Sequence, residues 1–394
     1  MVFLLILLLA DWPQFLGPER NGTYDGPPIR GDAPKLVWQT GVGAGFAGPV
    51  VVGERLIVFH RKEDREIVEA LERKTGESVW RHDYSTSYRD DFGFDEGPRS
   101  VPVVAKGVVY TFGAQGVLSA VELETGRALW SVDTRKRFRV VKGFFGAAGS
   151  PVVEDGRLLL NVGGRDAGLA AFDAATGEVL WTAGKDEASY SSPVMASFAG
   201  KTLALFFTRD GLVAVDPATG EEKHRLQWHS RSRASVNAAS PLVVGDVVFL
   251  SASYGTGAIA LAVESGGLET LWSGDESLSN HYATSVHRDG ILYGFHGRQE
   301  YTQSFRAVEL RTGKVRWSED GFGAGTVTLA GDRLVIVHES GELIIARAES
   351  DSFRPISRAQ LIPGVIRAYP ALSDAILYVR NSGTLAAFDL DDGR

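Results

Sequence analysis

One short phrase recurs along the chain: a small residue, an acidic residue two places later, Thr-Gly three and four places after that, and Trp four places after the Gly. A fifth copy, with Gly220, carries His224 in the Trp position. Internal repeats with a period of about 40 to 50 residues indicate an array of one supersecondary unit. The complete copies are marked by Gly76, Gly126, Gly177 and Gly313.

Residues 150–181 show what one repeat contains. Short apolar runs at 150–153, 157–162, 169–173 and 179–181 are separated by turns rich in Gly and Asp. Runs of this kind are typical of antiparallel strands joined by hairpins. None of them has the apolar spacing of a helix. Four strands in a repeat of this length predict one blade of a β-propeller.

Counting strands predicts an all-β, eight-bladed propeller of four-stranded antiparallel blades. The chain ends at Arg394, just after the last third strand, so the last blade lacks an outer strand. Residues 35–40 have the pattern of a fourth strand without a blade, and we expect this N-terminal strand to close the last blade, which removes an open sheet edge. First strands are expected to begin near Pro49, Pro102, Pro151, Pro193, Pro241, Ser285, Thr326 and Pro370, and third strands to end near Glu72, Glu122, Asp173, Asp216, Glu264, Glu309, Ala348 and Asp389.

The repeated A-x-D/E-x-x-T-G-x-x-x-W phrase resembles the tryptophan-docking repeat of the pyrroloquinoline quinone (PQQ) propeller family. That family includes eight-bladed quinoprotein alcohol dehydrogenases and BamB, a subunit of the outer-membrane β-barrel assembly machinery. The resemblance runs from about Asp11 to the C-terminus, and residues 11–18 resemble the opening phrase of BamB-like members. It implies that the Trp side chains pack between blades, with the indole N–H bonded. The expected docking residues are Trp38, Trp80, Trp130, Trp181, Trp272 and Trp317.

The N-terminus predicts export. Residues 2–9 form an unbroken apolar run that ends at Ala10 and is followed by Asp11. The run is too short to span a bilayer as a helix, but it matches the apolar region of a signal peptide with a small residue before the cleavage site. A buried extra strand or a ragged gene start is the alternative. We expect residues 1–10 to be a signal peptide, 11–34 a lead segment and 35–394 one propeller, in a periplasmic or secreted protein.

Composition excludes several classes of function. The formal net charge of −8 and the isoelectric point near 5.6 argue against general nucleic-acid binding, which requires a basic face. The chain contains no Cys, which excludes disulfides, thiolate catalysis and Cys-ligated metals. His281, His287 and His296 fall on different strands or turns, so their spacing does not indicate a zinc site.

The resemblance implies two possible functions. The first is a non-catalytic scaffold of the bacterial cell envelope that binds a protein or peptide partner, as a monomer, without catalytic residues, metal or cofactor. The alternative is a PQQ-dependent alcohol or sugar dehydrogenase, with the cofactor and calcium at the mouth of the central channel. No Glu, Asn and Asp trio aligns with the calcium site of those enzymes, and the pair of adjacent cysteines that many of them carry is absent.

Residues where inner strands and blade-to-blade loops meet are the candidate binding site. They would form a polar ring at the channel mouth, suited to an anion, a sugar or a quinone. The alternative is a water-filled channel in which these groups only satisfy the ends of the inner strands. The candidates are Arg99, Ser150, Ser192, Asn237, His281, Tyr282, Arg367 and Tyr369.

Two loops carry unusual charge. The acidic cluster at residues 90–96 is expected to be a solvated loop, since its spacing does not match a calcium-binding EF-hand. A basic stretch at residues 135–142 precedes two phenylalanines, and Arg231 and Arg233 extend a second loop. Both basic loops should open on the same face of the propeller. We therefore expect one rim to be locally basic, either as a solvated surface or as a contact for an acidic partner or a phosphate.

Overall fold

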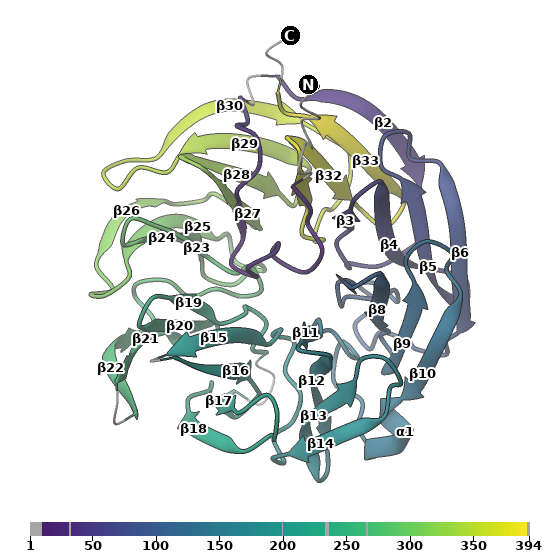
Figure 1. Cartoon of the computed structure of the whole chain (residues 1–394). Helices are drawn as coiled ribbons and strands as arrows, with labels where there is room; N and C mark the ends of the chain where they lie inside the picture. Colours follow the sequence, from purple (N-terminus) through teal and green to yellow (C-terminus); the bar gives the residue numbers. More distant parts are fainter. Residues whose placement is uncertain (1–9, 31–32, 199, 233–235, 265–266, 392–394) are drawn as a thin grey trace, which may run out of the picture.

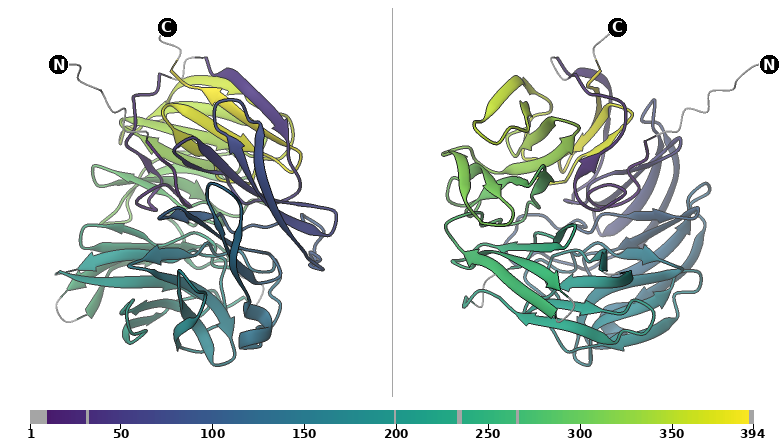
Figure 2. Two further views of the ribbon diagram at one scale, coloured as in Figure 1. Left: turned by 45° about the vertical axis from the view of Figure 1, so that its right-hand side comes forward. Right: turned by 60° about the vertical axis from the view of Figure 1, so that its left-hand side comes forward.

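Eight β-sheets stand side by side around one axis in the computed structural model of the protein (Figures 1 and 2). The predicted signal peptide, apart from Ala10, lies outside the residues that the structure describes, and so does Arg233. The described residues are 10–30, 33–198, 200–232, 236–264 and 267–391.

Each sheet contains a blade of four antiparallel strands, as predicted, and one of the sheets gains a fifth, parallel strand. The predicted first and third strands all exist, and their bounds differ from the predictions by no more than one residue. Blades one to four comprise β3 (Val50–Val52), β4 (Arg55–Lys62), β5 (Arg65–Glu72), β6 (Ser78–Ser85); β7 (Val103–Ala105), β8 (Val108–Phe112), β9 (Val117–Glu122), β10 (Ala128–Asp133); β11 (Val152–Glu154), β12 (Arg157–Gly164), β13 (Ala167–Asp173), β14 (Val179–Ala183); and β15 (Val194–Phe198), β16 (Lys201–Phe207), β17 (Gly211–Val215), β18 (Glu222–Gln227). Blades five to eight comprise β19 (Leu242–Val244), β20 (Val247–Ala252), β21 (Gly257–Glu264), β22 (Gly267–Gly274); β23 (Val286–Arg288), β24 (Ile291–His296), β25 (Ser304–Glu309), β26 (Val315–Glu319); β27 (Gly325–Ala330), β28 (Arg333–His338), β29 (Glu342–Arg347), β30 (Arg354–Gln360); and β31 (Ala371–Ser373), β32 (Ile376–Arg380), β33 (Thr384–Asp389) with β2 (Lys35–Gly41).

The N-terminal strand closes the ring, which confirms the prediction. Strand β2 pairs antiparallel with β33, and the register places Trp38 opposite Ala387. The two strands lie side by side in Figure 1, although more than 300 residues separate them in the chain. Strand β2 therefore covers the edge of β33 and completes the four strands of the last blade.

All six predicted tryptophans link neighbouring blades. Each indole N–H donates a hydrogen bond to a backbone carbonyl of the next blade, and five of the rings cover the glycine of that blade's Thr-Gly turn. A Cβ on Gly177 would lie 2.6 Å from the Trp130 ring, and the φ angle of Gly177 is +73°, so this position needs glycine on both counts. The bonds are Trp38 to Arg73 (3.0 Å), Trp80 to Leu123 (2.9 Å), Trp130 to Ala174 (3.0 Å), Trp181 to Pro217 (3.1 Å), Trp272 to Leu310 (2.8 Å) and Trp317 to Glu349 (2.9 Å).

Two blades lack a tryptophan at this position. The docking residue pairs with an alanine of the third strand in the complete blades, as Trp130 does with Ala120. In blade four the same register pairs Ala214 with His224. In blade seven, which has also lost the Thr-Gly turn, the equivalent residue is Ser357, opposite Ile345.

The hydrophobic core lies between the blades and not at one centre. The buried apolar side chains fall into separate clusters, most of which join two neighbouring sheets. For example, Leu205 and Phe207 of blade four pack with Val248 and Leu250 of blade five. Each sheet buries both faces against its neighbours, which is why the inner strands read as almost continuous apolar runs.

The lead segment crosses the axis of the ring, a placement that the sequence did not predict. Trp12 exchanges backbone hydrogen bonds with Val51 of blade one, and the Pro13 carbonyl accepts one from Val104 of blade two. Strand β1 (Thr23–Tyr24) then runs parallel to β27 as a fifth strand on the inner edge of blade seven. In Figure 1 this dark purple segment passes over the centre of the ring.

Arg20 fixes the middle of the lead segment. Its guanidinium is buried and donates to the carbonyls of Pro151 (2.9 Å) and Ser150 (3.2 Å) in blade three, and to Gln14 (3.0 Å). Burial lowers the pKa of Arg20 to about 9, but these three oxygen acceptors favour the charged form at neutral pH. Tyr24 continues the attachment, because its hydroxyl accepts a hydrogen bond from the Ala375 N–H of blade eight.

Helical structure is a minor part of the described chain. Helix α1 (Thr134–Phe138) follows β10, and Asp133 caps it by accepting a hydrogen bond from the Lys136 N–H at 2.9 Å. No helix within the described ranges is long and apolar enough to cross a membrane.

Candidate functional site

A pocket of about 220 Å³ opens at one end of the axis, where the blade-to-blade loops converge. Seven of the eight predicted residues line it: Arg99, Ser150, Ser192, His281, Tyr282, Arg367 and Tyr369. Phe15 of the lead segment also lines the pocket, and its ring meets that of Tyr369 edge-on at a centroid distance of 4.9 Å. We call this site the mouth pocket.

Two arginines of the mouth pocket stack on aromatic rings. The Arg99 guanidinium lies 5.5 Å from the centroid of Phe46 and 5.6 Å from that of Phe145. The Arg367 guanidinium lies 5.6 Å from the centroid of the same Phe46 ring and 5.4 Å from the centroid of Phe94. Phe46 is thus shared by both cations. Such stacking holds a guanidinium in place by electrostatic attraction to the ring while leaving N–H groups for other contacts.

Each arginine also has an acidic neighbour. Nη2 of Arg99 donates to the Asp95 carbonyl at 2.9 Å and lies 3.4 Å from the Asp90 carboxylate. Nε of Arg367 donates to Glu339 at 3.1 Å. The buried Nη1 of Arg99 has no hydrogen-bond partner within the described part of the chain. A buried donor without an acceptor is costly, and this cost makes Arg99 an unusual group for a purely structural role.

The acidic loop at residues 90–96 differs from its prediction. The Asp90 side chain is fully buried and accepts hydrogen bonds from the backbone N–H groups of Phe94 (2.7 Å) and Asp95 (3.2 Å). Asp95 is 8% exposed and binds the Gly97 N–H. These two carboxylates therefore shape the loop that presents Phe94 and Arg99, and only Asp91 and Glu96 match the expected solvated surface.

The histidine and tyrosines of the mouth pocket are held in neutral forms. His281 Nε2 lies 3.0 Å from the Tyr254 hydroxyl, and burial lowers the pKa of His281 to about 4. Tyr282 donates to Glu339 at 2.8 Å, and burial raises the pKa of Tyr282 well above its usual range. Burial likewise raises the pKa of Tyr369, whose hydroxyl accepts a hydrogen bond from the Thr284 N–H. An acid–base catalyst usually has a pKa near the working pH. The pKa values of these groups all lie away from neutral pH.

Ser150 and Ser192 belong to a chain of hydrogen bonds that runs from blade to blade. Ser150 Oγ accepts from the Val101 N–H (2.8 Å), and Ser192 Oγ accepts from the Ser150 N–H (2.8 Å). The series continues through Ser240 (3.1 Å) and Thr284 (3.0 Å). The two predicted serines thus satisfy inner-strand backbone groups, which is the role that the water-filled-channel alternative gave them.

Asn237 lies apart from the other candidates, in a larger groove beside the mouth pocket. Its side-chain N–H donates to the Thr208 carbonyl at 2.7 Å. Its Oδ1 atom is buried without a hydrogen-bond donor among the described residues. The groove and the mouth pocket share Ala148 and Tyr190, so they form neighbouring parts of one face.

Sequence reasoning missed the aromatic lining of the mouth pocket. Phe94 and Phe145 come from two loops of unequal length, and their rings lie 6.2 Å apart. Phe92 packs against both rings, 6.2 Å from Phe94 and 5.3 Å from Phe145, and is 56% exposed. One signal in the sequence could have found it. Two neighbouring blade-to-blade loops each contain a pair of phenylalanines, and large apolar side chains in surface loops often mark a binding site.

The comparisons with known proteins decide the family. The family model described as outer membrane protein assembly factor BamB matches residues 63–319. The chain belongs to the PQQ-like β-propeller repeat family. Within this family it is 24% identical to BamB of Shewanella oneidensis over 383 residues, which cover 91% of this chain and 89% of that protein. It is also 32% identical to the quinohemoprotein alcohol dehydrogenase ADH-IIG of Pseudomonas putida over 120 residues, which cover 29% of this chain and 16% of the enzyme.

Solved structures of the family share the fold. The crystal structure of BamB from Moraxella catarrhalis superposes with a TM-score of 0.67 at 14% identity, and covers 91% of this chain and 98% of that one. Quinohemoprotein alcohol dehydrogenase from Comamonas testosteroni superposes with a TM-score of 0.69 at 15% identity, and covers 98% of this chain and 81% of that one. The predicted family and the predicted propeller are both confirmed.

A calcium-held quinone, which the enzymes of the PQQ-like family imply, does not fit the donors of the mouth pocket. Ca²⁺ takes about six to eight oxygen ligands, usually with several carboxylates. Glu300 is the one carboxylate among the described residues that line the pocket, and it pairs with Arg298 at 2.7 Å. No group of three or more His, Asp or Glu side chains in the described ranges is placed to hold a metal ion. The lining instead offers aromatic rings and stacked arginines.

Proposed function

We propose that the chain is a non-catalytic scaffold of the bacterial cell envelope that binds a partner protein, in the manner of BamB. The observation that carries this proposal is the extent of the matches. BamB of Shewanella oneidensis aligns with nearly the whole chain and over 89% of its own length, whereas the Pseudomonas putida dehydrogenase aligns over 16% of its length. The sequence match therefore extends over almost the whole of BamB, but over only a short part of the dehydrogenase.

The chemistry of the mouth face supports binding over catalysis. Stacked arginines and exposed phenylalanines are typical of protein interfaces, where aromatic residues and Arg are enriched. Burial displaces the pKa values of His281 and Tyr282 away from neutrality. No cofactor enters this proposal.

The apolar run at residues 2–9 supports an envelope location. A signal peptide of this kind would deliver the chain to the periplasm or outside the cell. The closed ring needs no second copy to cover an open sheet edge, so the proposal includes a monomer that acts through its surface loops.

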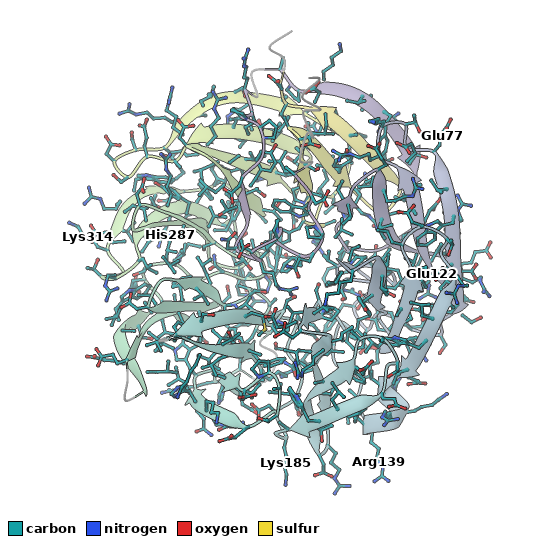
Figure 3. All side chains as sticks on the ribbon, in the orientation of Figure 1. Glu77, Glu122, Arg139, Lys185, His287 and Lys314 are labelled. Carbon is teal, nitrogen blue, oxygen red and sulfur yellow. The ribbon has the colours of Figure 1, made fainter. Side chains whose placement is uncertain are left out.

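The test is site-specific photo-cross-linking in the organism that encodes the chain. A photoreactive phenylalanine would replace Val141, which is 86% exposed on the mouth face. In the matched control, the same residue would replace Glu77, which Figure 3 labels at the outer rim. We expect a cross-linked envelope protein at position 141 and none at position 77, together with reduced amounts of folded outer-membrane proteins when the gene is deleted.

The alternative function supplies the contradicting result. The purified chain would be incubated with PQQ and Ca²⁺, then with alcohols or sugars and a redox dye. A quinone absorbance band that stays with the protein, and dye reduction that depends on substrate, would overturn the scaffold proposal. The same holds if neither cross-linked position captures a protein and the deletion leaves outer-membrane proteins unchanged.

A further inference from the structure

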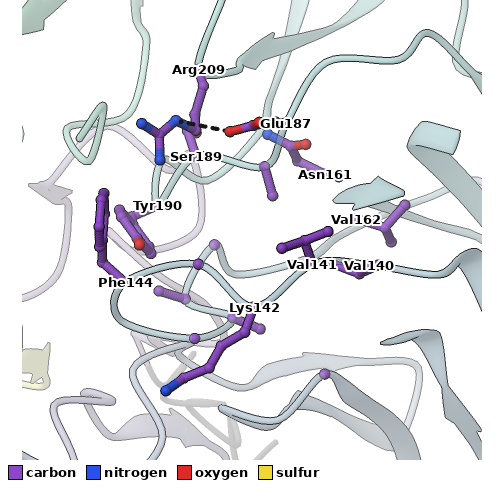
Figure 4. Close-up of a pocket in the computed structure, with 18 of the residues that line it drawn as sticks. Val140, Val141, Lys142, Phe144, Asn161, Val162, Glu187, Ser189, Tyr190 and Arg209 are labelled. Atoms are coloured by element: carbon purple, nitrogen blue, oxygen red, sulfur yellow. Dashed lines mark ion pairs between the residues drawn. The ribbon is translucent and has the colours of Figure 1, made fainter. Parts of the chain in front are cut away.

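A groove of about 1280 Å³ runs beside the mouth pocket, along the loops of blades two to four (Figure 4). Its lining comes from α1 and the segment that follows it, the β12–β13 turn, the β14–β15 connection and the start of the β18–β19 loop. Two of these segments, residues 135–142 and the loop that carries Arg231, are the ones that the sequence predicted to be locally basic. Arg233 lies outside the described residues, and Arg231 lines the groove.

The charge of this groove is opposite to that of the whole chain. Seven Lys or Arg side chains line it, against three Asp or Glu, although the chain has a formal net charge of −8. Two of the three acids are already neutralised, because Asp91 pairs with Lys142 and Glu187 lies 3.4 Å from Arg209. Figure 4 shows the second of these ion pairs as a dashed line.

Five of the cations have no salt-bridge partner among the residues that the structure describes. All five are exposed, and they come from separate elements: α1, its C-cap, the β12–β13 turn, and the connections after β14 and β18. Exposed cations held near one another without anions raise the local positive potential and attract an acidic ligand. The five are Arg135, Arg139, Arg165, Lys185 and Arg231.

The groove also offers apolar and hydrogen-bonding contacts. Val141 is 86% exposed among the cations, and the ring of Phe144 stacks with Arg209 at 5.7 Å. At the inner end, the buried Oδ1 atom of Asn237 has no donor among the described residues. Glycines supply several of the lining positions, so backbone amide groups are close to the groove surface. A polypeptide can use all of these contacts at once.

We propose that this groove binds an extended acidic segment of the partner protein. Its carboxylates pair with Arg135, Arg165 and Lys185, and an apolar side chain of the segment packs on Val141 and Phe144. The inference rests on the proposed scaffold function and specifies the chemistry of the partner. A peptide is favoured over nucleic acid because the chain as a whole is acidic and would repel a polyanion beyond the groove.

The experiment measures binding of a short peptide to the full-length exported chain by fluorescence anisotropy. The probe is a fluorescein-labelled peptide of twelve residues, alternating Glu and Ser with one central Leu, and its counterparts carry Lys or Gln in place of Glu. We expect the Glu peptide to bind at least tenfold more tightly than either counterpart in low salt. Raising the ionic strength from about 0.05 to 0.3 M should weaken binding, because salt screens exposed charges.

Charge reversal locates the site. The groove variant combines Arg135→Glu, Arg165→Glu and Lys185→Glu. The control variant combines Lys35→Glu, Lys201→Glu and Lys314→Glu, which are exposed, do not line the groove and change the net charge by the same amount. Lys185 and Lys314 project from different sides of the ring in Figure 3. We expect the groove variant to lose at least tenfold in affinity, and the control variant to stay within threefold, with unchanged thermal unfolding in both.

Three results would overturn the inference: equal loss in both variants, tight binding of the Lys or Gln peptide, or binding of a labelled twelve-nucleotide oligothymidylate as tight as that of the Glu peptide. A deletion strain distinguishes failure of this inference from failure of the scaffold proposal. If the groove variant restores outer-membrane proteins in the deletion strain as fully as the wild-type chain, the acidic-segment inference fails and the scaffold stands. If the deletion has no effect, the scaffold itself fails.

Discussion

At the outer rim of the ring one contact is repeated, whereas at the mouth the charged and aromatic side chains differ from blade to blade. Six indoles donate to a backbone carbonyl just after the third strand of the next blade, from Trp38 to Trp317. At the mouth, the loop after blade one supplies Arg99, the loop after blade five supplies His281 and the loop after blade seven supplies Arg367. The repeated contact stabilises the fold, and the unrepeated residues are free to specify a ligand. Substitutions in the two regions should therefore have different effects.

The largest effect is expected at the rim, where the ring closes. Trp38→Ala should lower the free energy of unfolding by about 4 kcal/mol, because a buried indole, 9% exposed, is lost and the Arg73 carbonyl loses its donor. Trp38→Phe, which keeps most of the apolar contact, should cost about 1 kcal/mol. Urea unfolding measures both. A loss below about 1 kcal/mol for Trp38→Ala would contradict the view that the rim stabilises the ring.

The lead segment extends the comparison to the axis. Arg20→Met should cost about 3 kcal/mol, because it leaves the buried carbonyls of Ser150 and Pro151 without a donor. Proteolysis within residues 11–24 should become faster in the variant. The matched control is Arg30→Met, whose side chain is 59% exposed and which should change stability by no more than about 0.5 kcal/mol. Equal effects at both positions would show that the axial contacts are not important for stability.

A smaller effect is expected from His281 as the pH falls. Its native pKa of about 4 lies below the value of about 6.5 in an unfolded chain, so the unfolded state binds more protons between these values. The contribution is fully present above pH 6.5 and is lost as the pH falls towards 4. His281→Asn, which does not titrate, should therefore lose about 2 kcal/mol less than the wild type between pH 7 and pH 4. Parallel stability curves for the two proteins would show that His281 is not buried in its neutral form.

The smallest effect is expected where the rim lacks its repeated residue. His224→Trp should raise the free energy of unfolding by about 1 kcal/mol, because His224 has the strand register of the docking tryptophans and an indole buries more apolar surface. Gln227→Trp, in the same strand but exposed, is the control and should change stability by about 0.5 kcal/mol at most. Thermal unfolding measures both. A loss of stability in the first variant would show that blades four and five pack differently from the other pairs.

The rim could be predicted from the sequence because its contacts recur at a fixed spacing. Each complete copy of the phrase gives the same strand, turn and indole, so one interpretation applies to all the blades that carry it. The closing role of residues 35–40 followed from counting strands, and the pairing of β2 with β33 confirms it.

The mouth could be predicted only in part. Seven candidates line one pocket because they follow or precede inner strands, whose ends must converge near the axis. Phe46, Phe94 and Phe145 were missed because loop conformation decides where their rings point, and loops do not repeat. The buried role of Asp90 was missed for the same reason, since its bonds to backbone N–H groups exist only in the folded loop.

The path of the lead segment was beyond sequence reasoning. Its hydrogen bonds join residues 12–24 to positions as distant as Leu329 and Ala375, and no local pattern reports such separations. The phrase at residues 11–18 indicated a family but not a location.

Because β2 finds its partner only in β33, the order of synthesis sets a limit on when the protein can be complete. The first forty residues leave the ribosome, and any translocation pore, long before residues 384–389 exist. Until then β2 has no sheet to join, and the nascent chain exposes this strand unpaired. Removal of β33 would therefore leave β2 without its partner, so a proteolytic cut before residue 384 would destabilise structure near the amino end.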